Sequence, residues 1–119
     1  MPQNSILPEA IKHRFSREIT FIRSCAHSGN IKISNHCYEQ MSERNIRVKD
    51  VYNSIKNGVI LEVQTNERDT KILFQDCSSQ PPYFFVSVAV KPSLGLCVTA
   101  YLPDTSIWRL ESNTQWRRK

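Results

Sequence analysis

Residues 48–64 read VKDVYNSIKNGVILEVQ, and the hydrophobic period changes in the middle of this stretch. In its first ten residues the apolar side chains recur at steps of three and four, which is typical of an amphipathic helix over residues 48–57. Gly58 is placed to end that helix in a left-handed turn. From Val59 onward apolar and polar residues alternate, as in a half-buried strand over residues 59–64. The chain therefore changes from helix to strand at Gly58, which predicts an α+β domain.

Helical patterns precede this point and strand patterns follow it. Apolar residues at three- and four-residue steps predict an N-terminal helix over about residues 8–29, and Ser34 is a good N-cap for a helix that reaches about Asn45. Further strands are predicted over residues 71–74, 83–90 and 96–102. Short polar or proline-containing connections join them, so we expect an antiparallel meander. We therefore predict two or three N-terminal helices packed on a four-stranded antiparallel sheet.

The chain of 119 residues has the length of a single domain, here residues 1–119, with a core over about residues 33–104 and a basic tail over residues 105–119. Its net charge of +5 favours a polyanionic partner such as nucleic acid. It has no apolar run near the ~18 residues of a membrane span and no signal-peptide pattern, so we expect a cytoplasmic protein without membrane contact. The four cysteines match no zinc spacing, so we expect free thiols, no metal and no cofactor.

The predicted helix after Ser34 carries a histidine, a glutamine and an arginine at four-residue steps: His36, Gln40 and Arg44. Side chains four residues apart lie on one side of a helix. A histidine can transfer protons near neutral pH, and an arginine can bind phosphate through its planar donors. These are the minimum components of a ribonuclease that works without metal. The alternative, that they are ordinary surface residues, stays open.

Three groups of residues form a pattern that is found together in one family. The first is I-S-x-H with a following Met, Glu-Arg and Ile, the second is Asn-Gly before an apolar strand, and the third is T-x-Y-x-P-D with a tryptophan and an arginine-rich end. In this chain they are Ile33, Ser34, His36, Met41, Glu43, Arg44 and Ile46, then Asn57, Gly58, Val59 and Ile60, then Val98, Thr99, Tyr101, Pro103, Asp104, Trp108, Arg117 and Arg118.

On these residues, about 15–119 of the chain resemble a small bacterial domain family of unknown function that is grouped with the RelE- and MqsR-like toxins. The resemblance implies a RelE- or barnase-like fold and a toxin-like, metal-independent endoribonuclease (an mRNA interferase). It implies RNA as substrate, including mRNA at the ribosome, and an antitoxin protein of the zinc-finger type as partner. The chain departs from the family where Gln40 replaces a common arginine and where Asn45 replaces a glycine, although Asn tolerates the left-handed conformation.

The candidate catalytic residues are His36 as general acid or base, Arg44 as the ligand of the charged phosphorus centre, and Tyr101 as a hydrogen-bond donor. The RNA-binding candidates are Lys71, Thr99, Gln40, Arg117 and Arg118. Each residue also has a structural explanation, such as a helix cap, a surface ion pair or an aromatic side chain at the edge of the core. The alternative function is therefore a non-catalytic RNA- or protein-binding module on the same fold, and Gln40 favours it.

The tail after Pro103 is predicted to be irregular or briefly helical. We expect Trp108 to anchor it on the core. Trp116 lies beside Arg117 and Arg118, where it could stack on RNA bases or belong to a frayed basic terminus.

Overall fold

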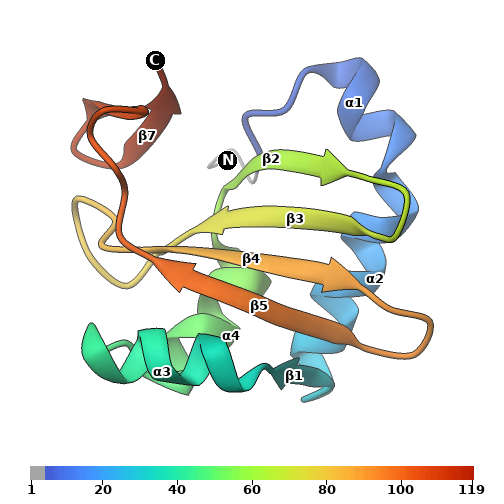
Figure 1. Ribbon diagram of the computed structural model, residues 1–119. Coiled ribbons are helices and arrows are strands. Elements are labelled where there is room, and N and C mark those ends of the chain that lie inside the picture. The colour runs from blue at the N-terminus through green and yellow to red at the C-terminus, as the bar shows by residue number, and fades with distance from the viewer. Residues whose placement is uncertain (1–4) are drawn as a thin grey trace.

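The computed structural model describes residues 5–119, which form four helices and seven strands (Figure 1). The helices are α1 (Glu9–Arg14), α2 (Ser16–His27), α3 (Asn35–Glu43) and α4 (Val48–Asn57). The strands are β1 (Ile31–Ile33), β2 (Ile60–Thr65), β3 (Thr70–Gln75), β4 (Phe85–Val90), β5 (Gly95–Tyr101), β6 (Trp108–Ser112) and β7 (Gln115–Arg118). The architecture is α+β, but its helices and its sheet differ from the predicted ones.

The main sheet has five strands in the order β1-β5-β4-β3-β2 and is mixed. Strands β2 to β5 form the predicted antiparallel meander. The prediction of a four-stranded antiparallel sheet was wrong because β1 adds a strand parallel to β5, with Ile31 opposite Gly95. β1 has only three residues, too few to show an alternating pattern, and its partner is distant in sequence. Local hydrophobic periodicity could not reveal this pairing.

The N-terminal helix predicted over residues 8–29 is two helices that meet at Phe15. The backbone of Phe15 leaves the helical region, with φ −106° and ψ 18°, while its side chain is buried. The apolar steps continue across this break, so the sequence pattern did not reveal it. With four helices, the prediction of two or three was also wrong. None of the helices within residues 5–119 is long and apolar enough to cross a lipid bilayer.

Helices α2 and α4 pack against each other and against one face of the sheet, behind it in Figure 1. The main core lies between these layers and includes the fully buried residues Ile22, Val51, Ile55, Phe74 and Val86. Helix α3 lies alongside β5, beyond the end of β1. The opposite face of the sheet, turned toward the viewer, is not covered by any helix within residues 5–119. We call it the helix-free face.

The C-terminal tail is a two-stranded hairpin, β6–β7, and not the irregular or helical segment that was predicted. Trp108 is buried in a second, smaller core with Leu61, Leu73 and Phe85, on one end of the helix-free face. Its predicted role as an anchor is confirmed. The Trp116 indole N–H donates to the carbonyl oxygen of Pro82 at 3.0 Å. Paired in β7 and bonded in this way, Trp116 belongs to a folded hairpin and not to a frayed terminus.

The ends of α3 and α4 show which local predictions succeed. The Ser34 hydroxyl oxygen accepts the backbone N–H of Cys37 at 3.1 Å, which confirms the predicted N-cap. Asn45, just after α3, has φ 55°, in the left-handed region. Gly58 ends α4 in extended conformation, with φ −72° and ψ 161°, so the predicted left-handed turn was wrong. Glycine is required there because a Cβ would collide with the carbonyl oxygens of Ser54 and Gln75.

Candidate functional site on the helix-free face of the sheet

The helix-free face carries polar side chains from three adjacent strands. Along β3, β4 and β5 the residues alternate between this face and the helix-packed core, which holds Ile72, Val86 and Ala100. The strand register then aligns residues of the helix-free face in rows across the sheet. One row contains Leu73, Ser87 and Thr99, and the next contains Gln75, Phe85 and Tyr101.

An ion pair between Glu62 and Arg118 lies at this face. The Arg118 Nη2 and Nε donate to the two carboxylate oxygens of Glu62 at 2.6 and 3.2 Å. The guanidinium carbon of Arg118 lies 4.9 Å from the centre of the buried Trp108 ring, in a cation–π interaction. Hydrogen bonding to Glu62 raises the pKa of Arg118. Hairpin β6–β7 thus brings a fixed positive charge to the edge strand β2.

Tyr101 lies on the same face, within electrostatic range of this ion pair. Its ring packs edge-to-face on Phe85, with the ring centres 5.7 Å apart. Burial raises the pKa of the Tyr101 hydroxyl, the negative charge of Glu62 raises it further, and the charge of Arg118 opposes the change. Tyr101 therefore stays protonated at neutral pH and can donate a hydrogen bond. The face combines a cation, a carboxylate and a phenol within electrostatic range of one another.

Gln40 fulfils a structural role at the edge of the sheet. Its side-chain oxygen accepts the backbone N–H of Ala100 at 2.9 Å. This contact satisfies a donor of β5 at the point where β1 has ended and α3 runs beside the strand. The structural contact explains a glutamine at this position, since an arginine side chain has no acceptor to offer.

Replacing Gln40 with leucine is expected to lower the free energy of unfolding by about 1–2 kcal/mol. The reason is that the Ala100 N–H would lose its hydrogen-bond acceptor at a partly buried position. Urea denaturation followed by circular dichroism measures the change. The matched control is His36→Leu on the exposed side of the same helix, for which we expect a change below about 0.5 kcal/mol. Equal effects of the two substitutions would contradict the structural role of Gln40.

His36 and Arg44 lie near opposite ends of α3. His36 is exposed in the first turn, and within residues 5–119 its side chain has no hydrogen bond or ion pair. Arg44 caps the end of the helix, where its Nη1 donates to the Gln40 carbonyl oxygen at 3.3 Å and lies 3.5 Å from the Glu43 carboxylate. A helix rise of 1.5 Å per residue separates the two backbone positions by about 12 Å. Neither residue has a recorded contact with Tyr101.

The other RNA-binding candidates are spread over the helix-free face and the hairpin. Thr99 lies in the middle row, opposite Ser87, and Lys71 lies in the row beyond it, opposite Ala89. Arg117 forms an ion pair with Glu111 across the hairpin. Of the predicted residues, the structure thus places Thr99 and Tyr101 on the helix-free face and brings Arg118 to that face from the hairpin. It leaves Lys71 at the far end of the same face and places Arg117 on the hairpin.

Sequence reasoning did not identify Glu62 as a candidate site residue. Glu62 was noted only as a polar position in the alternating pattern of a strand. Its partner Arg118 is 56 positions away, in a segment that was not expected to form strands. A carboxylate in a strand gave no separate signal, and only the position of the hairpin reveals the pair.

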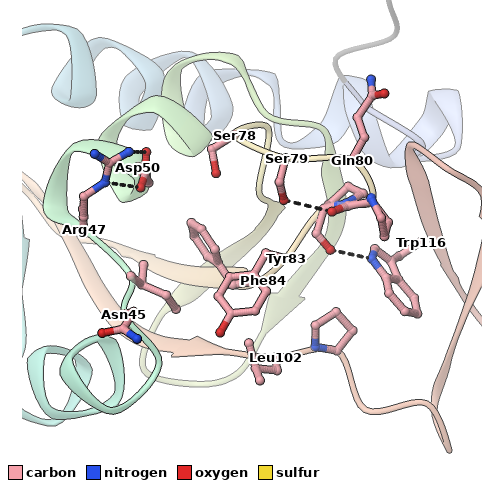
Figure 2. Close-up of a pocket in the computed structure, with 14 residues that line it drawn as sticks. Asn45, Arg47, Asp50, Ser78, Ser79, Gln80, Tyr83, Phe84, Leu102 and Trp116 are labelled. Carbon is pink, nitrogen blue, oxygen red and sulfur yellow. Dashed lines mark hydrogen bonds and ion pairs between the residues drawn. The ribbon is translucent and has the colours of Figure 1, made fainter.

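A pocket of about 680 Å³ opens beyond the ends of β4 and β5 (Figure 2). Its walls come from the α3–α4 junction, the loop before β4, the segment after β5, and Trp116. Asp76, which is 1% exposed, organises the loop. The Asp76 carboxylate accepts the backbone N–H groups of Ser78 and Tyr83 and the hydroxyls of Ser78 and Ser79. The Tyr83 hydroxyl also donates to the Arg44 carbonyl oxygen at 3.0 Å, which connects the loop to α3.

The fold and this site define a small α+β domain whose helix-free sheet face carries an arginine–carboxylate ion pair and a tyrosine within electrostatic range of it. The family described as domain of unknown function (DUF4258) matches residues 33–104, and the chain belongs to it. The match runs from the end of β1 through β5 and includes Glu62 and Tyr101, while hairpin β6–β7 follows it. Comparison with curated proteins gave no significant match, and comparison with solved structures gave none either.

Proposed function

We propose that this protein is a metal-independent endoribonuclease whose active centre is the helix-free face around Glu62, Tyr101 and Arg118. The observation that carries the proposal is the contact of Arg118 with Glu62 through two hydrogen bonds, on the same sheet face as Tyr101 and within electrostatic range of its hydroxyl. The planar donors that hold a carboxylate in this way also match two oxygens of a phosphate. A net charge of +5 supports a polyanionic substrate.

The three side chains supply what RNA cleavage by the substrate's own 2′-hydroxyl requires. When an RNA phosphate replaces Glu62 as the hydrogen-bond partner of Arg118, the Glu62 carboxylate becomes free. It then accepts the proton of the attacking 2′-hydroxyl. Arg118 stabilises the extra negative charge on the phosphorus centre. Tyr101 protonates the departing 5′-oxygen and regains a proton from Glu62 through solvent. The P–O5′ bond breaks, and the products carry a 2′,3′-cyclic phosphate and a 5′-hydroxyl.

This proposal retains Tyr101 and assigns the phosphate-binding role to Arg118 instead of Arg44. Arg44 is engaged with Gln40 and Glu43 at the end of its own helix. His36 stays a second candidate for proton transfer, because it is exposed on the helix that runs beside β5. Thr99, Lys71 and Arg117 would contact flanking nucleotides along the same face and the hairpin.

The toxin-like grouping and the antitoxin belong to this proposal. An antitoxin, of the zinc-finger type that the sequence resemblance implies, would neutralise the protein by covering the helix-free face. The cellular expectation is growth arrest on expression of the native chain and relief by Arg118→Gln.

The test is cleavage of an end-labelled RNA by the purified full chain in excess EDTA, with analysis of the product ends. We expect 2′,3′-cyclic phosphate products and a loss of at least about 100-fold in kcat/KM for Arg118→Gln, Glu62→Gln and Tyr101→Phe. Arg68→Gln is the matched control for Arg118→Gln. It removes the same charge from an exposed turn and should retain activity within about threefold.

The same assay separates the two candidate sets of residues. If His36→Ala and Arg44→Gln abolish cleavage while the Glu62, Tyr101 and Arg118 variants retain it, the active centre lies along α3 and the helix-free site is wrong. If the native chain leaves RNA intact in every buffer tested, the nuclease proposal itself fails.

A non-catalytic RNA- or protein-binding module is the second candidate function. The observation that favours it is that two of the three tail arginines already have carboxylate partners, Arg117 with Glu111 and Arg118 with Glu62. These pairs reduce the positive charge that is free to attract phosphate. RNA binding in a mobility-shift assay without cleavage would support this candidate over the first.

A further inference from the structure

Two buried cysteines face each other where α3 packs on β5. The Sγ atoms of Cys37 and Cys97 are 3.4 Å apart, and both residues are 0% exposed. Cys37 is in the first turn of α3, and Cys97 is in β5 opposite Ile33 of β1. Contacts on either side hold this junction together, because Ser34 bonds to Cys97 and Val98, and Gln40 bonds to Ala100.

The pKa values of the two thiols are shifted in opposite directions. The hydrogen bond from the Cys97 thiol lowers the pKa of Cys37, with burial opposing the change. The partner contact and burial together raise the pKa of Cys97 well above its ordinary value. Cys37 also lies near the start of a helix, where the free N–H groups favour a thiolate. We therefore expect Cys37 to act as the nucleophile of the pair and Cys97 as the resolving thiol.

We propose that Cys37 and Cys97 are a latent disulfide, an oxidative modification site that joins α3 to β5 and that a small peroxide closes. A disulfide requires an S–S separation of about 2.05 Å, so the sulfur atoms must approach by little more than 1 Å. A change of this size is within reach of a side-chain rotation and a slight shift of the first turn of α3.

The oxidation balances with hydrogen peroxide as the oxidant. The Cys37 thiolate attacks one peroxide oxygen, the O–O bond breaks, and the departing hydroxide takes up a proton to become water. Cys37 is then a sulfenic acid. The sulfur of Cys97 attacks the Cys37 sulfur, the S–O bond breaks, and hydroxide leaves with the Cys97 proton as a second water. The two thiols together lose two electrons and two protons, and the peroxide is reduced to two waters.

The other two cysteines serve as internal comparisons. Cys25 is buried against the main core, and burial raises its pKa. Cys77 is exposed in the loop after β3, and its pKa is also raised, mainly by burial of its sulfur and by the charge of Asp76. Neither has a sulfur contact like that between Cys37 and Cys97. Exposure alone would make Cys77 the first cysteine that peroxide oxidises. The close approach of Cys37 and Cys97 instead predicts a disulfide that does not include Cys77.

The test uses the folded full chain with Cys77→Ser, so that no intermolecular disulfide can form. The protein is treated with hydrogen peroxide, quenched, denatured, alkylated and analysed by mass spectrometry. We expect a loss of about 2 Da, two fewer alkylated thiols, and a linked pair of peptides that contains Cys37 and Cys97. The closed loop should raise the Tm by at least about 5 °C, and dithiothreitol should reverse the change.

Two control variants define the site. Cys25→Ser should form the same linkage, whereas Cys37→Ala should not form it and should show no rise in Tm with peroxide. If Cys37 and Cys97 in the native chain both remain open to alkylation after denaturation, the proposal is overturned. It is also overturned if the linkage appears only when peroxide is added in denaturant. These readouts require no RNA cleavage, so the inference stands or fails independently of the proposed function.

Discussion

Phe85→Ala is expected to lower the free energy of unfolding by about 3–5 kcal/mol, the usual cost of removing a fully buried aromatic side chain. Phe85 is 0% exposed at the start of β4, and its ring contacts three other aromatic rings edge-to-face. These are Tyr101 of the candidate site and Trp108 and Trp116 of the hairpin. One substitution therefore removes the support for both the tyrosine and the hairpin that carries Arg118.

The two tryptophans of this chain give this prediction a specific readout, because both lie in hairpin β6–β7. Tryptophan emission reports on the hairpin, while far-ultraviolet circular dichroism reports on the helices and the main sheet. In Phe85→Ala we expect red-shifted emission under native conditions and an emission transition at lower urea than the dichroism transition. The matched control is Phe21→Ala on α2, a half-buried ring outside the small core, which should cost about half as much or less. Coincident transitions with unchanged emission in Phe85→Ala would contradict the role of this ring.

Arg23→Met is expected to lower the free energy of unfolding by about 3 kcal/mol, since hydrogen bonds from a charged donor contribute about 1.5–3 kcal/mol each and solvent recovers part of the loss. Arg23 extends from α2 to the end of α4. Its guanidinium donates to the carbonyl oxygens of Ile55, Lys56 and Gly58 at 2.9, 2.9 and 3.2 Å. These carbonyls end the helix and have no intrahelical partner, and the positive charge also complements the helix dipole.

Methionine retains much of the apolar stem of Arg23 but removes its guanidinium, whose carbon lies 5.4 Å from the centre of the Phe74 ring. The substitution thus removes the hydrogen bonds and the cation–π contact while most of the apolar packing stays. Arg47→Met is the matched control, because the side chain of Arg47 is 68% exposed and its ion pair with Asp50 lies at the surface. We expect that control to change stability by less than about 0.5 kcal/mol. Urea denaturation of both variants measures the difference, and equal effects would refute the capping role of Arg23.

Features that depend on neighbours in sequence were predictable. Helix α4, the cap at Ser34 and the meander from β2 to β5 each follow from a periodic pattern or a capping residue that needs only nearby atoms. The burial of Trp108 agrees with its predicted role as the anchor of the tail on the core. For the candidate site, alternation along the strand predicted over residues 96–102 puts Thr99 and Tyr101 on one face, and their register opposite Ser87 and Phe85 agrees with it.

Features that depend on distant partners were not predictable. β1 is too short to have a period of its own and is a strand only because β5 lies beside it. The three- and four-residue apolar steps continue on both sides of the break at Phe15. The hydrophobic periodicity therefore does not reveal that the helix is interrupted. Hairpin β6–β7 alternates weakly, since only Trp108 is buried among the residues of β6.

By itself, the sequence determined the α+β class, the point at Gly58 where helices give way to strands, and the presence of a basic chain with a histidine and an arginine on α3. These properties are set by local backbone preferences and by composition. The tertiary structure alone decided that Arg118 lies against Glu62 on the face that carries Tyr101, and that Cys37 faces Cys97. Such contacts join side chains far apart in the chain, and their geometry exists only after the sheet, the helices and the hairpin have packed together.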